Sequence, residues 1–158
     1  MSTCKRQALI EAPVDSIWDL LGDPRRHPEW WPRIIEIDGQ RFDQGDEYVQ
    51  VTRGAMGSGE SRWLVEEKDD LREIHLRCQL TGTYARWHLT GAQGGTFVDL
   101  EMGMEPTGIS YKIFDATVGP RFFRRWADQS LDALGDACDA SGPASGAAAG
   151  GAGDPRRS

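Results

Sequence analysis

Two histidines and a carboxylate are the residues of this chain best suited to holding a metal ion. His75, His88 and Asp99 lie in stretches where apolar and polar residues alternate, the pattern of half-buried β-strands. Pairing these stretches as antiparallel hairpins aligns the three side chains in one row, and imidazole and carboxylate are ligands that Zn²⁺ accepts. The row faces solvent, however, where an ion would be unenclosed and without supporting hydrogen bonds. We therefore expect no metal and no cofactor, although an error of one residue in the predicted strand register would turn the row inward.

Three further residues could polarise a carbonyl or enolate oxygen. The predicted pairing directs Arg72 to the inner face of the hairpins, opposite Glu67. Ser61 faces the same interior, and Tyr111 approaches it from the C-terminal segment. Such donors can stabilise a developing oxyanion, but no histidine or isolated carboxylate accompanies them as general acid or base. These residues are therefore weak catalytic candidates, and a buried Cys78 is better interpreted as a packing residue than as a nucleophile.

A ladder of predicted strands positions these side chains. We place tight turns at Asp69-Asp70, Thr81-Gly82 and Gln93-Gly94, of which the last two supply the glycine that such turns favour. Three apolar rows then cross four strands on one face. The rows are Val65, Ile74, Leu89, Val98; Trp63, Leu76, Trp87, Leu100; and Ser61, Cys78, Ala85, Met102.

The opposite face of the same strands is polar. It carries Arg62, Arg77 and Arg86 in one row, where like charges repel by a few tenths of a kcal/mol per pair unless neighbouring glutamates relieve them. We expect a solvated face of a sheet that is covered on one side only. A surface for an anionic partner is the alternative.

The flanking segments predict helices that cover the apolar face. After Pro13, VDSIWDLL has helical spacing, whereas Pro24, Pro28 and Pro32 prevent one long helix around Trp30-Trp31. Near the C-terminus, a helical stripe has Phe122 and Trp126 at its flanks. The stripe consists of Phe123, Ala127, Ser130, Leu131, Leu134 and Cys138. A curved antiparallel sheet that grips one C-terminal helix is the simplest assembly of class α+β.

Composition limits the function further. The 158 residues carry a net charge of −7, which disfavours nucleic acid as a partner. Residues 1–140 are expected to form one domain, and the Ala/Gly-rich segment 141–158 a disordered tail. We find no signal peptide and no apolar run that could insert into a membrane. The three cysteines have no metal or redox spacing, so we expect a cytoplasmic protein with reduced thiols.

The chain resembles the START-related helix-grip superfamily (SRPBCC), in its polyketide cyclase/dehydrase and lipid-transport branch. The residues that carry the resemblance are Ala12-Pro13, Val14, Ile17-Trp18, Asp23-Pro24, Pro28, Trp30, Pro32, Gly95-Thr96, Leu131 and Leu134. The resemblance implies about seven strands around a long C-terminal helix, with two short helices after the first strand. It also implies that Trp30 and Trp31 plug one end of an internal cavity, although they could equally fill core beneath a loop.

We expect a protein that binds a small hydrophobic or aromatic ligand, lipid-like or polyketide-like, in a cavity between the sheet and the C-terminal helix. Such pockets are mostly apolar with few polar contacts. The predicted ligand-binding residues are Trp30, Trp63, Leu76, Cys78, Trp87, Leu100, Met102, Phe122 and Trp126. The alternatives are an aromatase/cyclase-type enzyme that uses Arg72, Tyr111 and Ser61 on a polyketide, or a protein-interaction module that docks through the exposed sheet.

Overall fold

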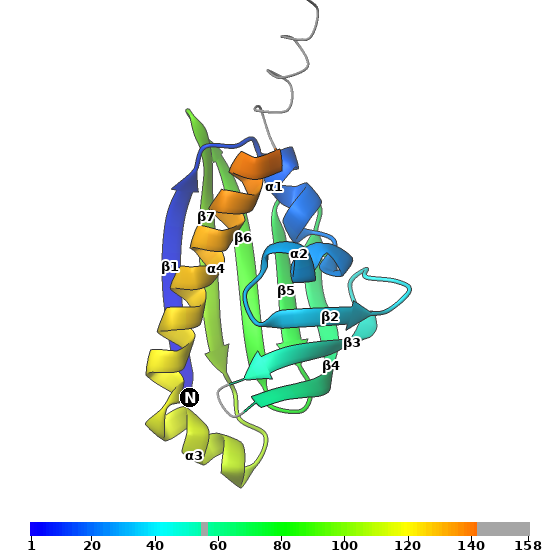
Figure 1. The fold of residues 1–158 in the computed structure, drawn as a ribbon, viewed down its shortest axis with the longest axis vertical. Coiled ribbons are helices and arrows are strands. Elements are labelled where there is room, and N and C mark those ends of the chain that lie inside the picture. The colour runs from blue at the N-terminus through cyan, green and yellow to red at the C-terminus, as the bar shows by residue number, and fades with distance from the viewer. Residues whose placement is uncertain (55–56, 142–158) are drawn as a thin grey trace, which may run out of the picture.

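A seven-stranded antiparallel sheet curves around one long helix in the computed structural model, which describes residues 1–54 and 57–141 (Figure 1). The strands are β1 (Ser2–Ile10), β2 (Ile34–Asp38), β3 (Glu47–Gly54), β4 (Gly57–Asp69), β5 (Glu73–Cys78), β6 (Thr83–Ala92) and β7 (Gly95–Met104). The helices are α1 (Val14–Leu21), the 3₁₀ turn η1 (Pro24–Arg26), α2 (His27–Trp30), α3 (Ile109–Thr117) and α4 (Gly119–Ser141). The sheet order is β1-β7-β6-β5-β4-β3-β2. The predicted helix-grip fold is confirmed. The predicted tail begins at Ser141, which is the last residue of α4, and its residues 142–158 lie outside the described part of the chain.

The β6–β7 hairpin has the predicted register. Trp87 pairs with Leu100 and Leu89 with Val98. Its two-residue turn contains Gly94 at φ +85°, a conformation that glycine adopts without steric cost. Strong alternation and a glycine turn together made this hairpin predictable.

The other two registers differ from the prediction, by two residues along β5–β6 and along β4–β5 up to Val65, and by three residues in β4–β5 from Glu67 onward. Ile74 pairs with Trp87 rather than Leu89, and Val65 pairs with Leu76 rather than Ile74. Between β5 and β6 the difference arises because β5 ends at Cys78 and a longer loop follows it. Between β4 and β5 the turn lies closer to Arg72 than the predicted turn at Asp69-Asp70. Because a shift of two residues keeps each side chain on its face, the apolar face is as predicted, and each of the inner residues named above as apolar is buried.

The core lies between this face and α4, and its centre is Trp87, which is fully buried. Its indole packs edge-to-face with those of Trp30 and Trp31, at centroid distances of 5.8 and 5.3 Å. Trp31 donates a hydrogen bond from Nε1 to Ser130 Oγ on α4 (2.8 Å), and Trp30 donates one to the carbonyl of Leu20 (3.0 Å). The paired tryptophans therefore fill the space between sheet and helix next to α1 and α2, and both indole N–H groups are satisfied there.

Candidate ligand-binding pocket

A pocket of about 360 Å³ lies between the inner face of the sheet, α3 and the first turns of α4, away from the paired tryptophans. Six aromatic side chains contribute to its walls. The aromatic lining residues are Trp63, Tyr111, Phe114, Phe122, Phe123 and Trp126.

The pocket exists because small residues occupy the inner-facing positions at this end of the sheet. Thr52 on β3, Ser61 on β4 and Thr83 on β6 line it, whereas large residues such as Trp87 fill the same face nearer α2. Protein interiors are otherwise packed to the density of organic crystals. A row of small side chains beneath a helix therefore leaves room for a guest.

The polar groups of the pocket are few and mostly neutral. Ser61 Oγ accepts a hydrogen bond from Trp63 Nε1 (3.0 Å), and the Thr81 hydroxyl bonds to that of Thr83 (2.8 Å). Among the described residues that line the pocket, Glu60 is the one with a charge, and it is exposed at the rim. The arrangement can orient a polar group of a guest, but it offers no cation for an anionic head group.

The nine predicted ligand-binding residues divide into two groups. Four line the pocket: Trp63, Cys78, Phe122 and Trp126. The other five are buried in the packed core and do not line it: Trp30, Leu76, Trp87, Leu100 and Met102. A role in binding stays a prediction for the first group, and packing is the role that the geometry supports for the second.

The prediction that Arg72 and Glu67 lie opposite each other on the inner face of the sheet is wrong. Arg72 lies in the exposed turn after β4, where its side chain is 76% exposed and 3.4 Å from Asp69. Glu67 points to the outer face, because the register shifts between Val65 and Glu67, as it does at a β-bulge.

The two other catalytic candidates do reach the pocket. Ser61 and Tyr111 both line it. Sequence reasoning missed Phe114 and Ser110 on α3 and the loop residue Leu80, which line it as well. The aromatic spacing of Tyr111 and Phe114, three residues apart, was a usable signal for a helix covering the pocket.

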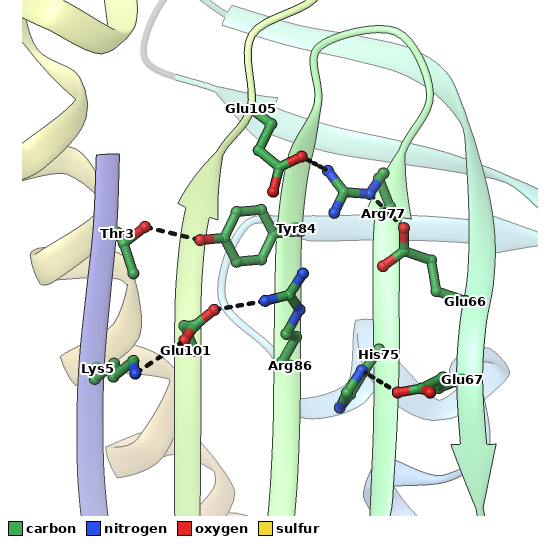
Figure 2. Close-up of polar contacts among 10 residues, drawn as sticks. All are labelled: Thr3, Lys5, Glu66, Glu67, His75, Arg77, Tyr84, Arg86, Glu101 and Glu105. Atoms are coloured by element: carbon green, nitrogen blue, oxygen red, sulfur yellow. Dashed lines mark hydrogen bonds and ion pairs between the residues drawn. The ribbon is translucent and has the colours of Figure 1, made fainter. Parts of the chain in front are cut away.

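Arg77 and Arg86 on the outer face are paired with glutamates (Figure 2). Arg77 binds Glu66 and Glu105, and Arg86 binds Glu101 at 2.9 Å. The predicted row of three arginines is wrong, because Arg77 lies opposite Leu64 and Tyr84, and Arg86 lies opposite His75. The glutamate partners offset the positive charges, as expected for a solvated face.

Comparison with known proteins places this geometry in a family. The family model described as polyketide cyclase / dehydrase and lipid transport matches residues 1–139. Curated proteins yield no match. Within the described residues, no helix is long and apolar enough to cross a membrane.

Solved structures share the fold. Protein MLL2253 from Mesorhizobium loti is 15% identical, with a TM-score of 0.68 over 89% of this chain and 99% of that one. Protein Ms6760 from Mycobacterium smegmatis is 17% identical, with a TM-score of 0.67 over 89% and 92%. The AHSA1-like protein from Aeromonas hydrophila is 12% identical, with a TM-score of 0.66 over 88% and 93%. At these identities the likeness shows the fold alone.

Proposed function

Because the chain belongs to the polyketide cyclase / dehydrase and lipid-transport family, we propose that it binds a small, uncharged apolar or aromatic molecule in the pocket beneath α3. The composition of the lining carries this proposal. Six aromatic side chains line the pocket among small and neutral residues, and the charge of Glu60 lies at the exposed rim. The volume of about 360 Å³ is at the small end of the range of about 300–1,000 Å³ for small-molecule sites.

A fluorescent probe tests this proposal directly. N-phenyl-1-naphthylamine is neutral and aromatic, and its emission rises in an apolar site. We expect saturable binding to the purified protein. Ser110→Trp should weaken this binding at least tenfold, because Ser110 is an exposed residue of α3 that lines the pocket.

Ala116→Trp is the matched control. It places the same side chain at an exposed position of α3 that does not line the pocket, so the probe should bind as it does to the wild type. Equal binding by both variants, or no saturable binding to the wild type, would show that the pocket does not hold such molecules.

A cyclase-type enzyme is the second candidate, and the observation that favours it is the presence of Ser61 and Tyr111 in the same pocket. Native mass spectrometry of protein from its own host would identify a co-purified ligand. Incubating that molecule with fresh protein separates the candidates. A binder returns it unchanged, whereas an enzyme changes its mass or retention time, and Tyr111→Phe or Ser61→Ala then slows the change by on the order of a hundredfold.

A further inference from the structure

A cluster of imidazole and carboxylate groups lies on the outer face of the sheet, on the opposite side from the pocket. Glu73 and His75 are on β5 and project to the same face, because they are two residues apart. His88 on β6 lies directly opposite Glu73. In the described part of the chain, these three residues are the group of possible metal ligands that lie close enough to share one ion. One nitrogen or carboxylate oxygen from each lies within 4.8 Å of the other two.

The hydrogen bonding of His75 leaves one ring nitrogen ready for a ligand bond. Its Nδ1 is 2.8 Å from Glu67 Oε2 (Figure 2). A carboxylate accepts, so Nδ1 carries the hydrogen and the neutral ring has its lone pair on Nε2. That atom is buried and has no hydrogen-bond partner, which is costly for a polar atom unless something binds it.

Glu67 supplies the support that the sequence pattern did not indicate. Histidines that bind metals normally donate their other N–H to a carboxylate or carbonyl, which fixes the ring and its tautomer. The register shift in β4 puts Glu67 opposite His75 and gives the ring this arrangement. His75 is also well enclosed, with a side chain only 13% exposed.

The charges around the cluster favour a cation. Glu73 contacts His88 and Glu67 contacts His75, so two carboxylates lie in the cluster. The arginine beside it, Arg86, is bonded to Glu101 at 2.9 Å and its charge is offset there.

We propose that Glu73, His75 and His88 form a site for a divalent transition-metal ion such as Zn²⁺, with Glu67 as the residue that orients His75. Two imidazole nitrogens and one carboxylate oxygen suit Zn²⁺, Co²⁺ or Ni²⁺ rather than Mg²⁺ or Ca²⁺, which prefer all-oxygen sites. Bonds of about 2.0–2.2 Å hold the ligand atoms about 3–4 Å apart, so His88 has to move away from Glu73, which it contacts, while the wider separations within the group close. His88, with a side chain 51% exposed, is free to make that movement. Water takes the fourth position on the solvent side.

Co²⁺ is the probe, added to untagged protein whose thiols are kept reduced. We expect visible d–d bands typical of nitrogen and oxygen ligands, and Zn²⁺ should abolish them by competition. Zn²⁺ at about a hundredfold its dissociation constant should raise the melting temperature by about 5–10 °C.

Four variants assign the site. His88→Gln and His75→Gln should each weaken Co²⁺ binding more than a hundredfold, and His88 is exposed enough for its variant to fold normally. Glu67→Gln should weaken it about 10–100-fold and alter the band shape, a change that loss of stability alone would not cause. Glu47→Gln is the control, because Glu47 is an exposed carboxylate of the sheet paired with Arg62, and it should bind Co²⁺ as the wild type does.

Three results would overturn the proposal. The first is no Co²⁺ binding at millimolar concentration. The second is binding that His88→Gln leaves intact. The third is a spectrum dominated by thiolate charge transfer, which would assign the metal to cysteine.

Discussion

His27 makes the stability of this protein depend on pH. Its ring is fully buried against Trp31 at a centroid distance of 5.0 Å, and its Nε2 lies 2.8 Å from the carbonyl oxygen of Leu21. A carbonyl accepts, so Nε2 carries the hydrogen. The Nδ1 atom is buried without a partner, and protonation would create a charged donor there that nothing accepts. Burial therefore lowers the pKa of His27 to about 4, against a smaller opposing effect of the bond to Leu21.

The size and sign of the effect follow from linkage. In the unfolded chain His27 titrates at about 6.5, so the unfolded state binds its proton first as the pH falls. The contribution of neutral His27 is complete above about pH 6.5 and is lost as the pH falls toward 4. At about 1.36 kcal/mol per pKa unit, the full loss is about 3 kcal/mol, and about 2 kcal/mol is already lost at pH 5.

Urea unfolding followed by tryptophan fluorescence measures this loss. The wild type and His27→Gln are compared at pH 7 and pH 5, because glutamine can still donate to the carbonyl of Leu21 but does not titrate. All other groups titrate in both proteins and cancel in the difference. We expect the wild type to lose about 2 kcal/mol more than the variant between the two pH values.

Equal losses in the two proteins would refute this reasoning, because they would show that His27 is protonated in the folded state without cost. A variant that is unfolded at pH 7 by near-UV circular dichroism would be replaced by His27→Asn.

Three stability predictions follow from burial and backbone geometry, each measured by urea or thermal unfolding. Trp87→Ala should cost about 3–5 kcal/mol as a large-to-small change at a fully buried site, and a cost under 1 kcal/mol would contradict its central position. Arg72→Ala should change stability by less than about 0.5 kcal/mol, since its ion pair lies in an exposed turn. Gly82→Ala should cost at least about 1–3 kcal/mol, because Gly82 has φ +79° and a Cβ atom there would overlap the carbonyl oxygen of Glu105. Gly59→Ala, which meets open space, is its control and should be far milder.

The faces of the strands were predictable because alternation is a local property. A residue such as Trp87 between Arg86 and His88 must lie on the opposite face from both. An error of two residues in register leaves that assignment unchanged, and so the apolar face was confirmed although two of the three registers were wrong.

The exact pairings were not predictable because they depend on turn conformations without a sequence signature. Leu71 adopts φ +67° in the turn between β4 and β5, where Asn, Asp or Gly would be the usual residue. After β5 the chain turns through a backbone bond from Gly82 N–H to the Cys78 carbonyl (2.9 Å) instead of a two-residue hairpin.

The pocket was harder to place than the core, because hydrophobicity marks a buried face but not a void. Leu76 and Trp63 are both buried residues of the inner face, yet Trp63 lines the pocket and Leu76 packs against neighbours. The difference depends on the position of α3 at one end of the sheet and on small inner residues such as Ser61, which alternation alone does not reveal.

One irregularity in β4 affects both faces of the sheet. Val65 is buried on the inner face, so regular alternation would turn Glu67 inward as well. The register shift turns it outward and opposite His75. The same shift brings Lys68 to the inner side, opposite Ile74, where its Nζ donates a hydrogen bond to the carbonyl oxygen of Phe42 (3.0 Å). The outer cluster gains Glu67, which accepts a hydrogen bond from Nδ1 of His75, so the arrangement proposed for the metal site depends on this bulge.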